Sequence, residues 1–307
     1  MNILISTNRK FLKYAKEMLM SLADSNDDFL NIFLLNNEIP EKEKKEAKIF
    51  VKNRCHGKLI IIESPINNLK DMPVSDGKKA FFGIEAYNRL FCQFILPKNI
   101  DKILYLDSDI LINSDISDLY NMELNTKSLY VACKDESAAH GDEKKRLSLP
   151  DNYIYVNSGV LLINLKDLRK KYTIEEITNF IKNKKDILKY PDQDVLNLLY
   201  CNEIKIIPNR YNFILKDICY YDKDEPAYII HYAGKEKPWK IKGGRYEISY
   251  LIYYYKILLK ERKFLKLILI FLLHRIYYLF CLFKKKIKNR AIKKLYLNIQ
   301  RYYNRRN

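Results

Sequence analysis

The stretch Ile103-Leu-Tyr-Leu-Asp107-Ser108-Asp109-Ile-Leu-Ile112 places two carboxylates between two apolar runs. Side chains two residues apart in an extended chain point to the same side, so Asp107 and Asp109 can act on one ligand. Carboxylate oxygens suit Mn²⁺ or Mg²⁺ and leave further positions for phosphate oxygens. An acidic pair at a strand end is also typical of a solvated turn, but the apolar runs on both sides favour a pair that has a partner.

Apolar runs of strand length recur on both sides of this segment. We expect strands at residues 2–6, 30–35, 59–62, 102–106, 130–133, 160–164, 204–207 and 228–231. Helical patterns lie between them, including one over 85–95, whereas 134–150 is polar and is predicted to be a loop. This alternation predicts an α/β fold, a Rossmann-like and mostly parallel sheet with helices on both faces. Ligands of such sheets bind at the carboxyl ends of the strands, which is where Asp107 stands.

Two further segments carry polar residues beside predicted strands. The first is Tyr155-Val-Asn157-Ser158-Gly159, and the second is Tyr190-Pro-Asp192-Gln193-Asp194. Asn, Asp and Gln are the residue types that bind sugar hydroxyls. Acids in the first turn of a helix explain the second segment equally well, and both interpretations can hold together.

A fourth segment, Tyr228-Ile-Ile-His231-Tyr-Ala-Gly234-Lys-Glu-Lys237-Pro-Trp239, ends a predicted strand in a histidine. Its imidazole can supply a nitrogen ligand to Mn²⁺. Gly234 allows close backbone approach to a ligand, and Lys237 offers a charge for a phosphate. A buried, hydrogen-bonded histidine is the alternative for His231.

The four blocks LDSD, NSGVLLIN, DQD and HYAGKEKPW, in this order, resemble glycosyltransferase family 8. That group includes bacterial lipopolysaccharide galactosyl- and glucosyltransferases and the glycogenins. The resemblance covers about residues 1–239. It implies a GT-A type domain, which we place at 1–245. It also implies a retaining α-glycosyltransferase that moves galactose or glucose from UDP-Gal or UDP-Glc to a glycan acceptor. The acceptor would be a saccharide or lipid-linked saccharide of lipopolysaccharide, capsule or another surface glycan.

The resemblance also assigns residues. Asp107, Asp109 and His231 would bind Mn²⁺ or Mg²⁺ across the diphosphate. The rest of the donor site would comprise Ser6, Asn8, Phe11, Arg89, Ser108, Asn157, Ser158, Gly234 and Lys237. Asn8 stands where close relatives have Asp, so the contact with uracil would differ there.

The catalytic residues would be Gln193, Asp192 and Asp194. A nucleophile at Gln193 or Asp194 and a front-face transfer assisted by the leaving phosphate both stay open. Phe81, Ala86, Asp135 and Ala233 would lie near the acceptor, although a solvent-facing loop acid is the alternative for Asp135.

Two other functions share part of this pattern. A sugar nucleotidyltransferase shares the sheet and the acidic pair but needs a glycine-rich loop after the first strand. The segment Ser6-Thr-Asn-Arg-Lys10 has no glycine. An inactive membrane-bound scaffold that binds glycans would be expected to lose a metal ligand, and Asp107, Asp109 and His231 are all present.

The net charge of +18 is concentrated at one end of the chain. Residues 251–307 hold 16 Lys and Arg and one acid, a net of +15, which leaves +3 for the first 250 residues. The six cysteines have no zinc-like or CxxC spacing, and the N-terminus lacks a signal-peptide pattern, so we expect a cytoplasmic protein. The charge asymmetry predicts a basic tail that meets an anionic surface.

The tail, residues 246–307, contains the apolar run Phe264–Phe283, which is interrupted by Lys266, His274 and Arg275. A central Arg is unfavourable in hydrocarbon. On a helical wheel, one face holds Lys256, Lys260, Lys263, His274, Lys285 and Lys288. Mostly opposite lie Leu265, Ile268, Leu269, Leu272, Leu279 and Phe283, and Leu267, Ile270 and Tyr278 interrupt the stripe.

This pattern favours an amphipathic helix lying on the inner face of the cell membrane, attracted by about 1 kcal/mol per basic residue. Packing on the body and a dimer contact are the alternatives. Nucleic acid is not expected as a partner, because such apolar runs suit lipid better than phosphate.

Overall fold

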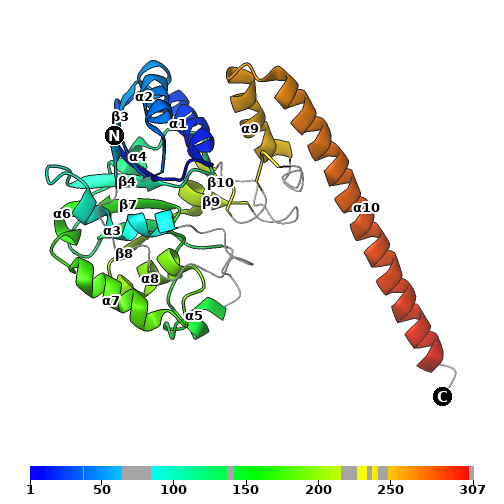
Figure 1. Ribbon diagram of the computed structural model, residues 1–307. Coiled ribbons are helices and arrows are strands. Elements are labelled where there is room, and N and C mark those ends of the chain that lie inside the picture. The colour runs from blue at the N-terminus through cyan, green and yellow to red at the C-terminus, as the bar shows by residue number, and fades with distance from the viewer. Residues whose placement is uncertain are drawn as a thin grey trace. The chain divides into compact units, whose positions relative to one another are not determined.

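The computed structural model describes residues 1–36, 38–63, 84–136, 142–215, 227–233, 237–240 and 248–303 (Figure 1). The chain forms two compact units. The first comprises Met1–Leu215 and Tyr221–Lys235, and the second comprises Lys216–Tyr220 and Glu236–Asn307.

The first unit is built on a seven-stranded sheet with the strand order β3-β2-β1-β4-β7-β6-β8. Its strands are β1 (Asn2–Ser6), β2 (Leu30–Leu35), β3 (Gly57–Ile62), β4 (Lys102–Leu106), β6 (Tyr130–Cys133), β7 (Val160–Asn164) and β8 (Ile204–Ile207). Neighbouring strands are parallel except around β7, which is antiparallel to both β4 and β6. The predicted mostly parallel α/β sheet is confirmed.

Helices cover both faces of this sheet (Figure 1). On one side lie α1 (Leu12–Ser25) and α2 (Glu41–Arg54); on the other lie α3 (Asn88–Ile95), α6 (Leu165–Leu168), α7 (Ile174–Lys184) and α8 (Pro191–Leu199). Successive strand residues point to opposite faces, so Ile3 and Ile5 of β1 join the core under α1 while Leu4 joins the core under α3. Because both faces are buried, the strands are nearly continuous apolar runs, which is why the sequence revealed them.

A small second sheet has the strand order β5-β10-β9, with β5 (Ile110–Ile112), β10 (Ile229–His231) and β9 (Phe213–Ile214). β5 is the next strand after β4 in the chain, and the short segment between them holds the two aspartates. β10 pairs with β5 antiparallel and sets His231 opposite Ile110. This register brings a histidine from late in the chain next to Asp109.

Two sequence expectations for the first unit need correction. The helix expected over 85–95 is a 3₁₀ turn, η2 (Ile84–Tyr87), followed by α3. The predicted loop at 134–150 contains the short helix α5 (Asp142–Arg146). Its acids come first and its bases last, which suits the helix dipole, but it has no apolar stripe to reveal it. Short helices also form at α4 (Ser117–Tyr120) and η3 (Asn209–Asn212).

The described helices of the second unit are α9 (Ile248–Lys260) and α10 (Phe264–Tyr303). They are separated by a turn in which Arg262 has a φ of 55°. The prediction of one helical face running from Lys256 to Lys288 was therefore wrong, because the turn changes the register between the helices. His274, expected among the lysines, is 1% exposed and hydrogen-bonds the Tyr255 hydroxyl of α9 at 2.9 Å.

Candidate active site

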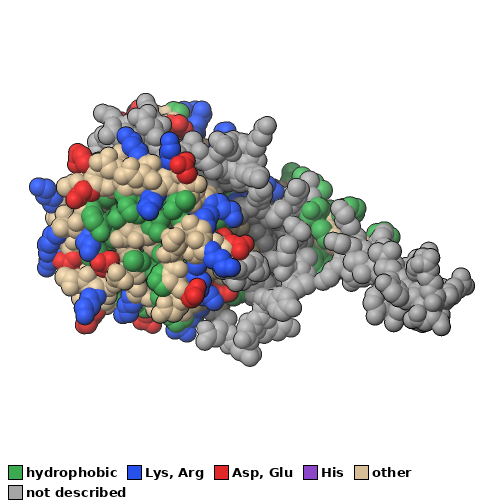
Figure 2. Space-filling view, turned by 90° about the horizontal axis from the view of Figure 1, so that it is seen from below, with side chains coloured by type: hydrophobic (Ala, Val, Ile, Leu, Met, Phe, Trp, Pro, Cys, Tyr) green, Lys and Arg blue, Asp and Glu red, His purple; other side chains and the backbone are tan. Residues whose placement is uncertain are grey.

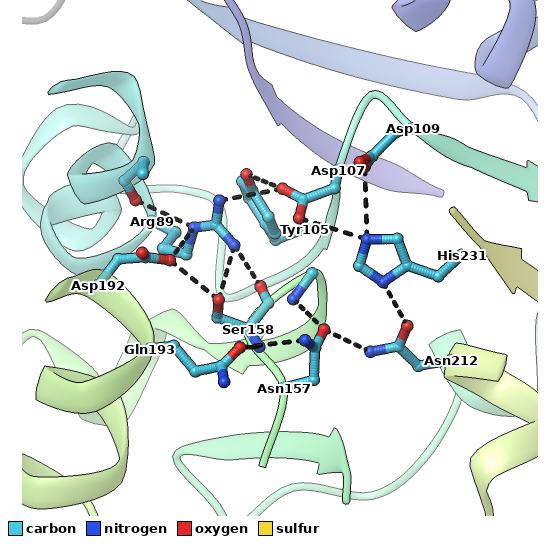
Figure 3. Close-up of polar contacts among 12 residues, drawn as sticks. Arg89, Tyr105, Asp107, Asp109, Asn157, Ser158, Asp192, Gln193, Asn212 and His231 are labelled. Atoms are coloured by element: carbon cyan, nitrogen blue, oxygen red, sulfur yellow. Dashed lines mark hydrogen bonds and ion pairs between the residues drawn. The ribbon is translucent and has the colours of Figure 1, made fainter. Parts of the chain in front are cut away.

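Two carboxylates and an imidazole converge at the carboxyl end of β4 (Figure 3). Asp107 directly follows β4, Asp109 directly precedes β5, and His231 ends β10. His231 Nε2 lies 3.3 Å from Asp109 Oδ1 and 3.8 Å from Asp107 Oδ2. One ligand atom from each of the three residues lies within 4.8 Å of the others.

These residues fit a divalent metal ion, because two carboxylate oxygens and one neutral imidazole nitrogen are a donor set that Mn²⁺ accepts. The Ser108 hydroxyl between the two aspartates is buried, and it has no hydrogen-bond partner among the described residues. Buried hydroxyls are normally paired, so this one is available to a bound group.

The backbone before β7 packs tightly against this cluster. The Asp107 amide donates to the Gly159 carbonyl at 2.9 Å. A Cβ on Gly159 would come within 2.3 Å of His231 Cε1 and 2.8 Å of Asp107 Oδ2. Only glycine fits here, because any side chain would displace one of the predicted metal ligands.

Arg89, at the start of α3, connects the cluster to α8. Its guanidinium lies 3.0 Å from Asp107 Oδ1 and 3.2 Å from Asp192 Oδ2. It also donates to the Ser158 carbonyl at 2.6 Å and stacks 4.3 Å from the centroid of the Tyr105 ring. The side chain is 6% exposed, so these contacts hold it in one position.

Burial and neighbouring charges shift the pKa values of these side chains in opposite directions. Burial by itself lowers the pKa of Arg89, but the facing Asp107 and Asp192 raise it above its usual value, so Arg89 stays cationic. Burial raises the pKa of Asp192, against the opposing effect of Arg89. Burial also raises the pKa of Tyr105, which stays protonated and donates to Asp107 Oδ1 at 2.6 Å.

Amide side chains form the next part of the site (Figure 3). Asn157 donates to Gln193 Oε1 at 3.0 Å, and Gln193 donates to Asp135 Oδ2 at 2.7 Å. Asp135 is 4% exposed, so the alternative of a solvent-facing loop acid was wrong. Gln193 and Asp192 lie in the first turn of α8, as the acid-rich helix start predicted.

Asp194 is the most enclosed of the three predicted catalytic residues. Arg146 of α5 contacts both of its carboxylate oxygens at 2.9 Å, and the Tyr155 hydroxyl donates to one of them at 2.6 Å. The Lys189 and Tyr190 amides donate to the other at 2.7 and 2.9 Å. Asp194 is 0% exposed, so in this arrangement it holds the start of α8 in place.

The residues expected around uridine lie at the end of β1, the strand next to β4 in the sheet. Ser6 accepts a hydrogen bond from Asn88 of α3 at 3.0 Å. The Asn8 side chain accepts from the Phe11 amide at 3.2 Å, which caps the turn before α1. The register of β1 with β4 brings these residues and Asp107 to the same edge of the sheet.

Some predicted residues are not placed at this edge. Gly234 and Phe81 lie outside the described residues. Lys237 belongs to the second unit. Near the expected acceptor region, Arg89 Nε donates to the Ala86 carbonyl at 3.0 Å, and Ala233 is half-buried after β10.

Four residues of the site were not predicted from the sequence. They are Asn88, Tyr105, Arg146 and Asn212, each within hydrogen-bond distance of a predicted residue. Tyr105 is indistinguishable from a core residue in an apolar strand. The other three carry no local signal, because their partners are distant in sequence.

The family model for glycosyl transferase family 8 matches residues 2–243, most of the chain. The chain belongs to glycosyl transferase family 8. It is thus a glycosyltransferase, as the four sequence blocks indicated.

Two relatives show how far the likeness extends. The lipopolysaccharide 1,2-glucosyltransferase of Escherichia coli K12 is 35% identical over 186 residues, which are 57% of this chain and 54% of that enzyme. The lipopolysaccharide 1,3-galactosyltransferase of Salmonella typhimurium is 25% identical over 175 residues, 53% of this chain and 51% of that enzyme. The matched region thus spans about half the length of these two relatives.

Among solved structures, the galactosyltransferase LgtC, in complex with donor and acceptor sugar analogs, has a TM-score of 0.69 at 24% identity. The match covers 78% of this chain and 90% of LgtC. This likeness confirms the GT-A type fold of the family 8 chain.

Proposed function

We propose that this family 8 enzyme is a retaining α-glycosyltransferase that uses UDP-galactose or UDP-glucose as donor and Mn²⁺ as metal. Its acceptor would be a saccharide or lipid-linked saccharide of lipopolysaccharide or another surface glycan, reached at the cytoplasmic face of the membrane. The observation that carries the proposal is the Asp107–Asp109–His231 cluster at the sheet edge, with fixed amide and carboxylate groups beside it. The metal cluster suits a nucleotide diphosphate, and the fixed amide and carboxylate groups suit the hydroxyls of a sugar.

The metal cluster serves the donor diphosphate. Asp107, Asp109 and His231 would hold the ion, which when bound neutralises charge on the leaving UDP. Arg89 and Tyr105 fix the Asp107 carboxylate from behind, so that it keeps one orientation as the donor binds. Ser108 offers its unpaired hydroxyl to a phosphate or ribose oxygen.

The amide groups serve the sugar. Asn157 and Gln193 present polar atoms that their mutual hydrogen bond holds in position, and Asp135 accepts from Gln193. We assign Gln193 the role of positioning the oxocarbenium-like transition state. Retention follows in this proposal from a front-face transfer, in which the leaving phosphate takes the proton of the acceptor hydroxyl. Asp192, paired with Arg89 and Ser158, would orient the donor sugar.

The test is a panel of UDP-sugars incubated with the full chain and Mn²⁺, with UDP release and sugar transfer followed separately. We expect UDP release from UDP-galactose or UDP-glucose, and its loss in Asp109→Asn. The matched control is Asp101→Asn, an exposed acid that directly precedes β4 and so lies at the opposite end of that strand. Full turnover in Asp109→Asn would refute the metal assignment, and release of UTP from UDP-sugar and pyrophosphate would indicate a nucleotidyltransferase instead.

The membrane part of the proposal rests on α10. Its segment Phe264–Phe283 has a mean hydropathy of 1.9 and is long and apolar enough to cross a membrane. Leu265 is 86% exposed, and Ile268, Leu269, Leu272 and Leu279 are each more than half exposed. Figure 2 shows mixed charges over the visible face of the first unit and hydrophobic side chains on the described part of α10.

We favour a helix that lies on the membrane rather than one that crosses it. His274, near the middle of the segment, hydrogen-bonds Tyr255 and the Lys240 carbonyl at 2.8 Å, so a spanning helix would carry these polar partners into hydrocarbon. Beyond Phe283 the sequence continues with Lys284, Lys285 and Lys286, which anionic headgroups attract.

Co-sedimentation with vesicles tests this surface. The full chain should bind vesicles of phosphatidylcholine with phosphatidylserine more strongly than phosphatidylcholine alone, and Ile268→Glu with Leu272→Glu should abolish the binding. Ile49→Glu is the control, since Ile49 is 60% exposed but belongs to the first unit. Undiminished binding by the double variant would refute membrane contact through this face.

A further inference from the structure

Asn212 connects the predicted metal ligand to the predicted sugar-binding residues, and no sequence feature indicated it. Its Oδ1 lies 2.8 Å from His231 Nδ1, and its Nδ2 donates to Asn157 Oδ1 at 2.9 Å. Asn212 is 1% exposed and ends the 3₁₀ helix η3, immediately before β9. A continuous series of hydrogen bonds therefore runs from His231 through Asn212 and Asn157 to Gln193 (Figure 3).

The direction of this series is set by backbone groups, which cannot reverse. The Gly159 amide donates to Asn157 Oδ1 at 2.9 Å, so that atom must be the acceptor oxygen. The Ser158 amide donates to Gln193 Oε1 at 3.2 Å, which fixes the second side-chain amide in the same way. Asp135, an acceptor, faces the Gln193 nitrogen. Exchanging the oxygen and nitrogen of any one of these side-chain amides would place two oxygens, or two N–H groups, against each other.

The same logic reaches the imidazole. Because Asn157 Oδ1 requires a donor from Asn212, the Asn212 oxygen must face His231, and Nδ1 must carry a proton. Nε2 is then the nitrogen that faces Asp107 and Asp109, where a metal ion would be held. The outer nitrogen of a metal-binding histidine commonly has such a partner, which fixes the ring and raises its basicity.

We propose that Asn212 is a positioning residue with two separate effects. By accepting from Nδ1 it holds His231 in the tautomer that can bind metal, and by donating to Asn157 it holds the amides that meet the sugar. This inference rests on the proposed function for the identity of the ligands, but the proton on Nδ1 can be measured without any ligand.

Two substitutions separate the effects. Asn212→Ala removes both hydrogen bonds and should raise the Mn²⁺ dissociation constant by about 10–100-fold. Asn212→Asp still accepts from Nδ1 but sets an oxygen against Asn157 Oδ1. It should bind Mn²⁺ within about 3-fold of the unchanged chain, yet lose about 10-fold in kcat at saturating Mn²⁺, as expected for one buried hydrogen bond replaced by a repulsion.

Mn²⁺ affinity is read from the electron paramagnetic resonance of the free ion during titration of the full chain. Asn209→Ala, in the same 3₁₀ helix, is the control for damage to η3. The Asn209 side chain donates to Glu136 at 2.7 Å, outside the series from His231 to Gln193, so this variant should leave Mn²⁺ binding unchanged. Equal losses of Mn²⁺ affinity in Asn212→Ala and Asn212→Asp would indicate a merely structural role and overturn the inference.

The tautomer is read from long-range ¹H–¹⁵N spectra of the metal-free protein, in which the four histidines give separate ring patterns. We expect a protonated Nδ1 on His231, assigned by its loss in His231→Gln. A bare Nδ1 would overturn the inference even if the enzyme is active. Absence of Mn²⁺ binding by the unchanged chain, with Nδ1 protonated, would instead refute the metal assignment of the proposed function and leave the tautomer result standing.

Discussion

Replacing Gly159 by alanine should disable the metal cluster through a clash that the structure locates. The new Cβ would lie 2.3 Å from His231 Cε1, short of an ordinary carbon–carbon contact of about 3.5 Å by about 1.2 Å. Asp107 Oδ2 at 2.8 Å and Asn157 Oδ1 at 3.0 Å close off the other directions. Either the imidazole or the start of β7 must move, and metal sites tolerate ligand displacements of only about 0.2 Å.

We therefore expect the Mn²⁺ dissociation constant of Gly159→Ala to rise by about 10–100-fold, equivalent to about 1.4–2.8 kcal/mol. Overpacking should also lower the free energy of unfolding by about 1–3 kcal/mol. The first quantity is measured by Mn²⁺ titration with paramagnetic resonance, and the second by urea unfolding without metal.

Gly57→Ala separates the two effects. A Cβ there would lie 2.5 Å from the Leu30 carbonyl oxygen, at the start of β3. This control should lose stability by a similar amount while keeping the Mn²⁺ affinity of the unchanged chain. If Gly159→Ala binds Mn²⁺ within twofold of the unchanged chain, the cluster is not the metal site or the packing around Gly159 is not as described.

Three further outcomes follow from the buried charges. Arg89→Met leaves Asp107 and Asp192 without their shared cation and should lower the free energy of unfolding by about 3–5 kcal/mol in urea, the usual effect of breaking a buried ion pair; an unchanged midpoint would contradict this. Because burial raises the pKa of Asp192, the folded state holds that proton more tightly than the unfolded state, and stability falls as pH rises from about 4 through the raised pKa. Asp192→Asn removes this loss. Between about pH 4 and 7 the urea midpoint of the variant should therefore rise relative to that of the unchanged chain; parallel pH profiles would refute the assignment. Arg146→Met removes the two guanidinium contacts to Asp194 and should cost about 1.5–3 kcal/mol of stability and reduce sugar transfer, measured together on one preparation.

Much of the fold could be predicted because its strands are buried on both faces. Runs such as Leu30–Leu35 and Lys102–Leu106 are apolar except for Asn31 and Lys102, and they have the predicted bounds. Elements without an apolar pattern escaped prediction. The helix α5 is wholly charged, and the turn between α9 and α10 lies in a sequence whose composition does not mark it.

Local features can be derived from the sequence alone: the alternating α/β pattern, the paired acids after β4, and the concentration of basic charge after residue 250. Contacts between distant groups arise only on folding. The pairing of β10 with β5 sets His231 beside Asp109, and backbone amides before β7 orient the side-chain amides of Asn157 and Gln193. Such contacts depend on strand register and on hydrogen-bond direction. The residues on either side of Asn212 indicate neither of these. The role of Asn212 could therefore be inferred only from the folded chain.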